Sequence, residues 1–262
     1  MGDLWFVGAG LGDERDLSPR ALATLQSCRR VFAEEYTSVL APGTLERLGE
    51  SLGRPIERLG RAEVEGERVV LEALRTDGTV ALLVAGDPFV ATTHVQLRLA
   101  AERAGYEWHY LPGPSVATAA ISLLGLMHYR FGRVVSLPFA EPGFDPISPF
   151  EQVGRNRRSG AHTLVLLDLR PAEGRFLRAA EALQRFDGER ATSAAVEDAT
   201  EFGVVARVGR PDAAAWWGTR AVLREQEFGD PLHAIVVPAS ELHFQETEAV
   251  ARWRPNPASG PG

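Results

Sequence analysis

The chain has 262 residues, of which 45% are hydrophobic and 24% charged, and its formal net charge at pH 7 is −7. This length predicts one large or two medium globular domains with ample core. All 28 basic residues are arginine, which excludes a Schiff-base or P-loop lysine, and the negative charge argues against a nucleic-acid surface built on overall charge.

No segment of the sequence predicts export or membrane insertion. The longest apolar run, 116–127, is shorter than the roughly 20 residues that a bilayer requires, so we expect a soluble, cytoplasmic protein. The single cysteine, Cys28, lies in an apolar helical pattern and is expected in the core rather than as a nucleophile. The six histidines lack the His-x3-His and Glu-x2-His spacings, so no metal site is expected.

The first half of the chain alternates short apolar runs with helical patterns. Strands are predicted at 4–7, 30–33, 56–59, 80–85 and 106–111, and helices at 19–28, 44–52, 64–75, from 95 onward, and at 116–126. Strands that alternate with helices imply a largely parallel sheet.

Three of these strands end in turns rich in glycine and polar residues, at 8–12, 86–94 and 112–116. Ligands of open α/β sheets bind outside the carboxyl ends of the strands, so these turns predict a small-molecule site. The central turn begins Gly86-Asp87-Pro88. That tripeptide is also ordinary turn chemistry, and on its own it leaves both interpretations open.

The glycine turn at 8–12 suggests a dinucleotide site, with acidic residues at 34–35 at about the right distance for a ribose contact. In a Rossmann fold the helix begins inside the glycine turn, whereas Ser18 and Pro19 predict a later helix start. The acidic residues of 13–16 would repel a phosphate but not a cation.

The second half predicts another α/β domain. Strands are expected at 134–137, 163–167, 192–196, 203–208 and 234–237, and helices at 150–157, 172–186, the later part of 213–227, and 241–253. We expect domains at 1–127 and 128–253 and a disordered tail at 254–262. The arginines at 155, 157 and 158 predict a solvated basic face.

A cleft with glycine turns and acidic side chains, but without a nucleophile or a metal, suits a ligand that carries its own reactivity. S-adenosylmethionine is such a ligand, because its sulfonium makes the methyl group electrophilic and the protein need only hold acceptor and methyl about 3 to 3.5 Å apart. An α-amino acceptor, with a pKa of roughly 7.7 to 8.0, would make a strong base optional.

Four segments, 6–16, 31–38, 86–94 and 228–233, resemble the diphthine synthase family, which belongs to the tetrapyrrole-methylase-like S-adenosylmethionine methyltransferases. Gly-x-Gly-x-Gly and Gly-Asp-Pro mark the whole superfamily. Asp-Glu-Arg-Asp, Glu-x-Tyr-Thr-Ser and Ala-Thr-Thr-His narrow the resemblance to this member. At 111–115 and 207–211 the sequence departs from the family's pattern.

The resemblance implies a tetrapyrrole methylase-like, class III methyltransferase fold: two α/β domains with the cofactor cleft between them, assembled as a homodimer. The cofactor would be S-adenosyl-L-methionine, released as S-adenosyl-L-homocysteine. The acceptor would be the amino group of the modified histidine in translation elongation factor 2, methylated successively to diphthine. Methylation of a porphyrinoid and a non-catalytic nucleotide-binding module stay as alternatives.

The resemblance also assigns cofactor contacts, several of them through backbone groups. They are Leu11, Asp87, Val90, Ser115 and Val116 in the first half and Leu167, Val208 and Ala234 in the second. Asp87 is expected to orient the cofactor. Glu34, Tyr36 and His94 are candidates for a base or for a group that positions the acceptor, and none is assigned as catalytic.

Overall fold

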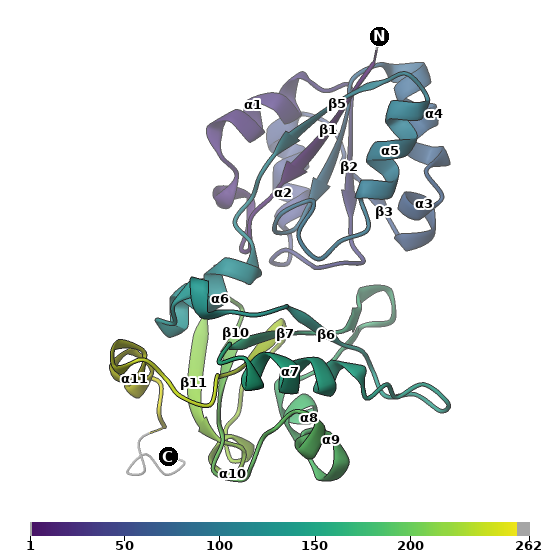
Figure 1. The fold of residues 1–262 in the computed structure, drawn as a ribbon. Helices are drawn as coiled ribbons and strands as arrows, with labels where there is room; N and C mark the ends of the chain where they lie inside the picture. Colours follow the sequence, from purple (N-terminus) through teal and green to yellow (C-terminus); the bar gives the residue numbers. More distant parts are fainter. Residues whose placement is uncertain (1, 256–262) are drawn as a thin grey trace. The chain divides into compact units, whose positions relative to one another are not determined.

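The computed structural model describes residues 2–255. The chain divides into two compact units, Met1–Val116 with Leu169–Arg175, and Ala117–Asp168 with Phe176–Gly262. Each unit contains a five-stranded sheet covered by helices (Figure 1), so the expected α/β fold is confirmed.

The sheet of the first unit is entirely parallel, in the order β3-β2-β4-β1-β5. Its strands are β1 Asp3–Gly8, β2 Arg30–Glu34, β3 Glu57–Leu59, β4 Val80–Val84 and β5 Glu107–Leu111. Every residue of β4 is buried, because helices cover both faces of a parallel sheet and its central strands therefore carry continuous apolar runs. The parallel sheet predicted for the first half is confirmed.

Helices of the first unit cover the two faces separately, with α1 and α2 on one side and α3, α4 and α5 on the other (Figure 1). Their bounds are α1 Pro19–Ser27, α2 Thr44–Leu52, α3 Arg61–Glu65, α4 Arg68–Asp77 and α5 Val95–Arg103, with a 3₁₀ turn at Glu14–Asp16. The single helix predicted at 64–75 is wrong. Gly66 ends α3, and Glu67 takes a φ of 63°, which interrupts the helix although the apolar period continues.

The first helix starts where its capping signal predicts. The Ser18 side chain accepts a hydrogen bond from the Ala21 N–H at 3.0 Å, and Pro19 is the first helical residue. Just after this helix, Cys28 is fully buried, and burial raises the pKa of its thiol to about 11. Cys28 is therefore a core residue, as expected.

Whereas the sheet of the first unit is entirely parallel, the sheet of the second unit is mostly antiparallel. Its order is β11-β10-β12-β7-β6, and only β6 and β7 run parallel. The strands are β6 Val135–Leu137, β7 Thr163–Leu167, β10 Glu201–Ala206, β11 Ala214–Thr219 and β12 His233–Val237. A separate two-stranded sheet pairs β8 Leu169–Arg170 with β9 Arg175–Phe176, and its residues up to Arg175 are counted with the first unit. A seven-residue loop, 207–213, connects β10 to β11 without a helix, so the two strands are antiparallel.

Helices of this unit are α6 Val116–Leu124, α7 Ser148–Arg158, α8 Ala179–Gln184, α9 Gly188–Ser193, α10 Arg220–Arg224 and α11 Phe244–Ala251, with a 3₁₀ turn at His128–Arg130. A further 3₁₀ turn, Pro171–Glu173, lies in the segment of the first unit. The strand predicted at 192–196 is wrong, because Asp187 caps α9 and that helix runs into the segment. The helix predicted at 172–186 begins only at Ala179, because Gly174 takes a φ of 63° and ends a 3₁₀ turn.

The basic cluster on α7 is only partly a solvated face. Arg155 and Arg158 are exposed, but Arg157 is half-buried and donates hydrogen bonds to the carbonyl oxygens of Ala195, at 2.7 Å, and Pro238. Within residues 2–255, no helix is long and apolar enough to cross a membrane. Most of the tail predicted at 254–262 lies outside the described residues.

Candidate functional site

The three glycine turns predicted at strand ends meet at one edge of the first unit's sheet. A Cβ on Gly113 would lie 2.3 Å from the Gly86 carbonyl oxygen and 2.9 Å from the carbonyl carbon of Gly8. The Gly86 N–H donates to the Gly10 carbonyl oxygen at 2.6 Å. Only glycine allows backbones to approach so closely, so these residues fix the carboxyl edge of β1, β4 and β5.

Asp87 is a buried carboxylate at the centre of this edge, with 6% of its surface exposed. Its Oδ1 accepts the Phe89 N–H at 2.9 Å, and its Oδ2 accepts the Gly113 N–H at 3.3 Å and the Tyr110 hydroxyl. Within residues 2–255, no arginine or histidine pairs with it. A buried negative charge held by hydrogen bonds, with no counterion from the protein, is complementary to a cationic ligand.

The loop that follows Asp87 is anchored at two further points. The Phe89 ring packs against Phe6, Tyr110 and Trp108, at centroid distances of 4.9, 5.2 and 6.2 Å. The Pro88 carbonyl oxygen accepts hydrogen bonds from the Thr92 hydroxyl at 2.6 Å and from the His94 ring at 2.7 Å.

Between these anchors, the loop presents Val90 and Ala91. Val90 is 40% exposed, and Ala91 takes a φ of 58°, a left-handed conformation that costs a residue with a Cβ about 1 to 2 kcal/mol. Strained backbone of this kind persists where its surroundings over-determine it, often at ligand sites. The tip of the loop is therefore a rigid surface that offers an apolar side chain.

Two of the three candidates for a base belong to one network. Glu34 is buried and accepts the N–H groups of Tyr36 and Thr37, at 3.0 and 3.1 Å, and the Thr37 hydroxyl. The Tyr36 hydroxyl lies 3.2 Å from the Thr93 hydroxyl, which donates to Glu65 at 3.1 Å. Burial raises the pKa of Tyr36, so its hydroxyl stays protonated at neutral pH. The Glu34 carboxylate is thus occupied by hydrogen bonds from its own turn, and the Tyr36 side chain carries a neutral hydroxyl.

His94, the third candidate, is 1% exposed. Its Nδ1 donates to the Pro88 carbonyl oxygen, and its Nε2 has no hydrogen-bond partner within the described chain. The edge of the ring faces Tyr36 at a centroid distance of 6.0 Å and an angle of 88°. Two of the segments that resemble the family, 31–38 and 86–94, are therefore in direct contact.

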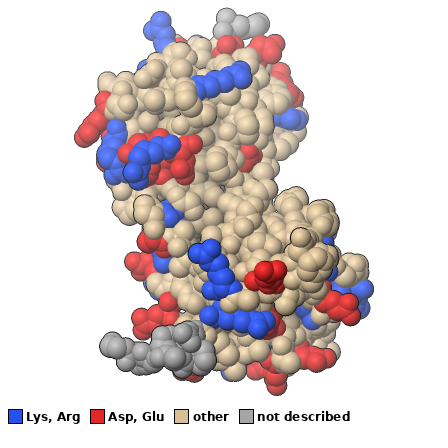
Figure 2. All heavy atoms as spheres, turned by 90° about the vertical axis from the view of Figure 1, so that its left-hand side faces the viewer, with Lys and Arg blue, Asp and Glu red and all other residues tan. Residues whose placement is uncertain are grey.

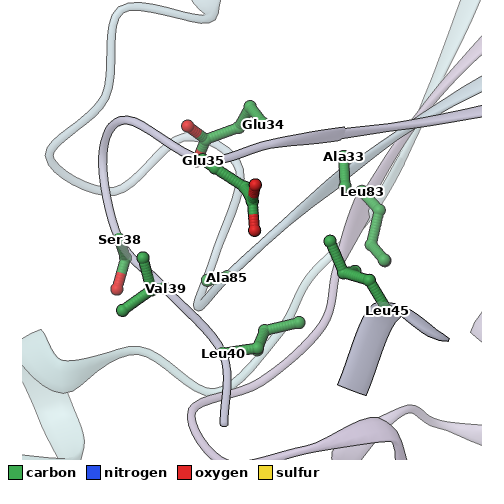
Figure 3. Close-up of a pocket in the computed structure, with 9 residues that line it drawn as sticks. All are labelled: Ala33, Glu34, Glu35, Ser38, Val39, Leu40, Leu45, Leu83 and Ala85. Atoms are coloured by element: carbon green, nitrogen blue, oxygen red, sulfur yellow. The ribbon is translucent and has the colours of Figure 1, made fainter. Parts of the chain in front are cut away.

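A small pocket opens at the ends of β2 and β4. It is lined by Ala33, Glu34, Glu35, Ser38, Val39, Leu40, Leu45, Leu83 and Ala85. Figure 3 shows the Glu35 carboxylate pointing toward the aliphatic side chains of the pocket, whereas the Glu34 carboxylate is turned toward its own loop. Glu35 also pairs with Arg58, so its charge is compensated.

The acidic residues that follow the first glycine turn all accept hydrogen bonds from arginines or from backbone N–H groups. Hydrogen bonds from Arg15 lower the pKa of Asp13 to about 2, and the hydrogen bond from Arg47, at 2.8 Å, lowers the pKa of Glu14. Asp16 accepts the N–H groups of Leu11 and Gly12, at 3.0 and 2.7 Å. Figure 2 shows one face of the molecule, where basic and acidic side chains lie next to each other at several places. Asp87, rather than these residues, supplies the unpaired negative charge.

The residues expected to contact the cofactor fall into two groups. Leu11, Asp87, Val90, Ser115 and Val116 belong to the three turns of the first unit. Leu167 ends β7, Ala234 lies in the adjacent strand β12, and Val208 follows β10.

The turn before Val208 is fastened by the preceding arginine. Arg207 takes a φ of 50° and donates hydrogen bonds to the carbonyl oxygens of Phe228, at 2.9 Å, of Asp230, and of Asp212, at 3.2 Å. This is where the sequence departs from the family's pattern, and the guanidinium there ties the β10–β11 loop to the segment before β12.

Sequence reasoning missed Trp108 and Tyr110. Aromatic residues at alternate positions of 107–111 give the one available signal, because alternate residues of a strand share a face. No group of three or more histidine, cysteine, aspartate or glutamate side chains within residues 2–255 could hold a metal ion.

Comparisons with known proteins by family model, by sequence and by structure agree with one another. The family model for tetrapyrrole (corrin/porphyrin) methylases matches residues 3–221. A diphthine synthase of Methanothermobacter thermautotrophicus is 40% identical over 248 residues, covering 94% of this chain and 93% of the relative. One from Methanosphaerula palustris is 38% identical over 245 residues, with 94% and 96% covered. A crystal structure of a diphthine synthase superposes with a TM-score of 0.86 at 32% identity, covering 97% of both chains.

Proposed function

The chain belongs to the tetrapyrrole methylase family and, within it, to the diphthine synthases, and from this premise we propose its acceptor, its cofactor contacts and its assembly. It is an S-adenosyl-L-methionine-dependent methyltransferase of diphthamide biosynthesis. Porphyrinoid methylation is not favoured, because relatives with 38 to 40% identity over nearly the whole chain are diphthine synthases.

The acceptor is the amino group on the modified histidine of translation elongation factor 2, methylated in successive steps to diphthine. Because this substrate works in translation, the enzyme acts in the cytoplasm. The chain assembles as a homodimer, which predicts the mass of two chains in light scattering. The mass of one chain would exclude that assembly.

The observation that carries the cofactor proposal is the buried, unpaired Asp87 carboxylate among three glycine turns. S-adenosyl-L-methionine carries a sulfonium and an α-ammonium, so a fixed negative charge without a protein counterion fits it. When bound, it supplies a methyl group made electrophilic by the sulfonium. A pyrophosphate would meet like charge at the same place.

The first unit holds the cofactor through the backbone of Leu11, Ser115 and Val116 and through Asp87 and Val90. In the second unit, Leu167, Val208 and Ala234 are assigned by family position. Each transfer to an amine requires the nitrogen lone pair, and an α-amino group has an appreciable neutral fraction near pH 7. Positioning therefore accounts for the reaction, and no side chain is assigned as the base.

Mass spectrometry of elongation factor 2 tests this function. The factor carries the precursor side chain and is incubated with the protein and S-adenosyl-L-methionine. We expect its mass to rise in steps of one methyl group, and Asp87→Asn to slow every step because the cofactor binds more weakly. Uroporphyrinogen is offered in a parallel reaction. Transfer to uroporphyrinogen with an unchanged factor would replace this proposal with the porphyrinoid alternative.

A further inference from the structure

Tyr110 is the one side chain within residues 2–255 that hydrogen-bonds Asp87. The other two donors to the carboxylate are backbone N–H groups, one from the loop of Asp87 itself and one from Gly113. None of the segments that resemble the family includes Tyr110, which comes 23 residues after Asp87 in the sequence.

The sheet fixes the place of this tyrosine. Tyr110 lies in β5, an edge strand whose five residues pair with β1, and its direct partner there is Phe6. Its ring packs on Phe89 with the two planes at 55°. Side chains carried by strands and locked by packing hold a functional group more precisely than loops do.

The hydroxyl has no packing role that phenylalanine would not fill equally well. Tyr110 is 40% exposed, so its oxygen could be hydrated, yet it donates to a carboxylate that is 6% exposed. Burial, and then the hydrogen bond to Asp87, raise the pKa of Tyr110 to about 12. The proton therefore stays on the hydroxyl at every pH at which the enzyme would work, and the donor is permanent.

We propose that Tyr110 is a positioning residue for the cofactor: its hydroxyl fixes the orientation of the Asp87 carboxylate toward the positive charge of S-adenosyl-L-methionine. The inference rests on the proposed assignment of Asp87 as a cofactor contact. Without the hydroxyl, Asp87 keeps only two backbone donors, and its Oδ2 keeps only the Gly113 N–H, at 3.3 Å. Tyr110 itself need not touch the cofactor.

A double-mutant cycle tests the proposal. The affinity for S-adenosyl-L-methionine and S-adenosyl-L-homocysteine is measured by calorimetry for the wild type, Tyr110→Phe, Asp87→Asn and the double variant, together with melting temperatures. We expect Tyr110→Phe to weaken cofactor binding about tenfold, as for loss of a hydrogen bond to a charged group, with little change in melting temperature. In the Asp87→Asn background, Tyr110→Phe should have no further effect.

One more readout separates positioning from general packing. In Tyr110→Phe the KM for the cofactor rises while kcat is nearly unchanged. Tyr106→Phe is the matched control, since Tyr106 precedes the same strand and its hydroxyl makes no hydrogen bond within the described chain.

The outcomes are distinct. If Asp87→Asn binds the cofactor as the wild type does, the proposed site is wrong. If Asp87→Asn binds weakly while Tyr110→Phe binds normally, the site stands and the role of Tyr110 is refuted. If Tyr110→Phe weakens binding equally in both backgrounds, its effect does not pass through Asp87, and the role is again refuted.

Discussion

Two buried histidines of the second unit are fixed in single neutral forms by their hydrogen bonds. In His233, Nδ1 accepts the Ala179 N–H at 3.2 Å, so Nε2 carries the proton and donates to the Asp230 carbonyl oxygen at 3.0 Å. In His162, Nδ1 accepts a backbone N–H at 2.9 Å, and Nε2 donates to the buried Glu246 at 3.1 Å. Burial lowers both pKa values, that of His233 to about 4.

The His233 pKa predicts a loss of stability in acid. At pH values between 6.5, the ordinary pKa of histidine, and about 4, the pKa of His233 in the folded chain, the imidazole is protonated only in the unfolded chain. The free energy of unfolding therefore falls as the pH decreases through this range. The contribution is about 3 kcal/mol at most. In urea unfolding at several pH values, His233→Gln should remove this part of the slope, and exposed His128→Gln should keep it. Equal slopes in the wild type and His233→Gln would contradict the assignment.

Among the elements, the close approach of the three turns depends on Gly113. A Cβ there would overlap backbone atoms of two neighbouring turns, and backbone cannot move aside as a flexible side chain can. We predict that Gly113→Ala lowers stability by about 1 to 3 kcal/mol and weakens cofactor binding more than tenfold, measured by denaturation and calorimetry. Gly60→Ala is the control, because its new Cβ would lie 3.7 Å from the nearest atom and its φ is −83°. Normal binding in Gly113→Ala would show that the turns can separate.

Local signals predicted most elements of the first unit, apart from the break between α3 and α4, and non-local contacts decided the features that no local pattern indicates. Ser18 capped its helix as predicted, and the three glycine turns converged as the ends of parallel strands must. The sequence predicts a strand at 192–196, but Asp187 caps α9, and that helix extends to Ser193. Tyr110 was missed because its hydrogen bond joins β5 to a loop 23 residues away, and no local pattern encodes that pair.

At the scale of the whole molecule, the chain has no lysine, and arginine side chains form hydrogen bonds that connect separate segments. Arg207 joins two loops, Arg157 reaches two carbonyl oxygens from α7, and Arg130 donates to Glu246 and to the Glu241 carbonyl oxygen. A planar group with five N–H donors can bridge several acceptors at once, which an ammonium does less well. These arginines therefore contribute to the fold of the second unit.

Cofactor binding should stabilise the chain against global unfolding. A ligand that binds only the folded state, at a concentration of about 100 times its Kd, adds about 2.7 kcal/mol, which for a protein of this size corresponds to a rise in melting temperature of about 5 to 10 °C. We expect this rise with S-adenosyl-L-homocysteine and none with NAD, because the negative charge of Asp87 opposes a pyrophosphate. Adenosine alone should give a smaller shift, since it lacks the amino acid part that carries the α-ammonium. An equal shift with NAD would mean that the glycine turns bind dinucleotides and that the unpaired carboxylate does not select the ligand.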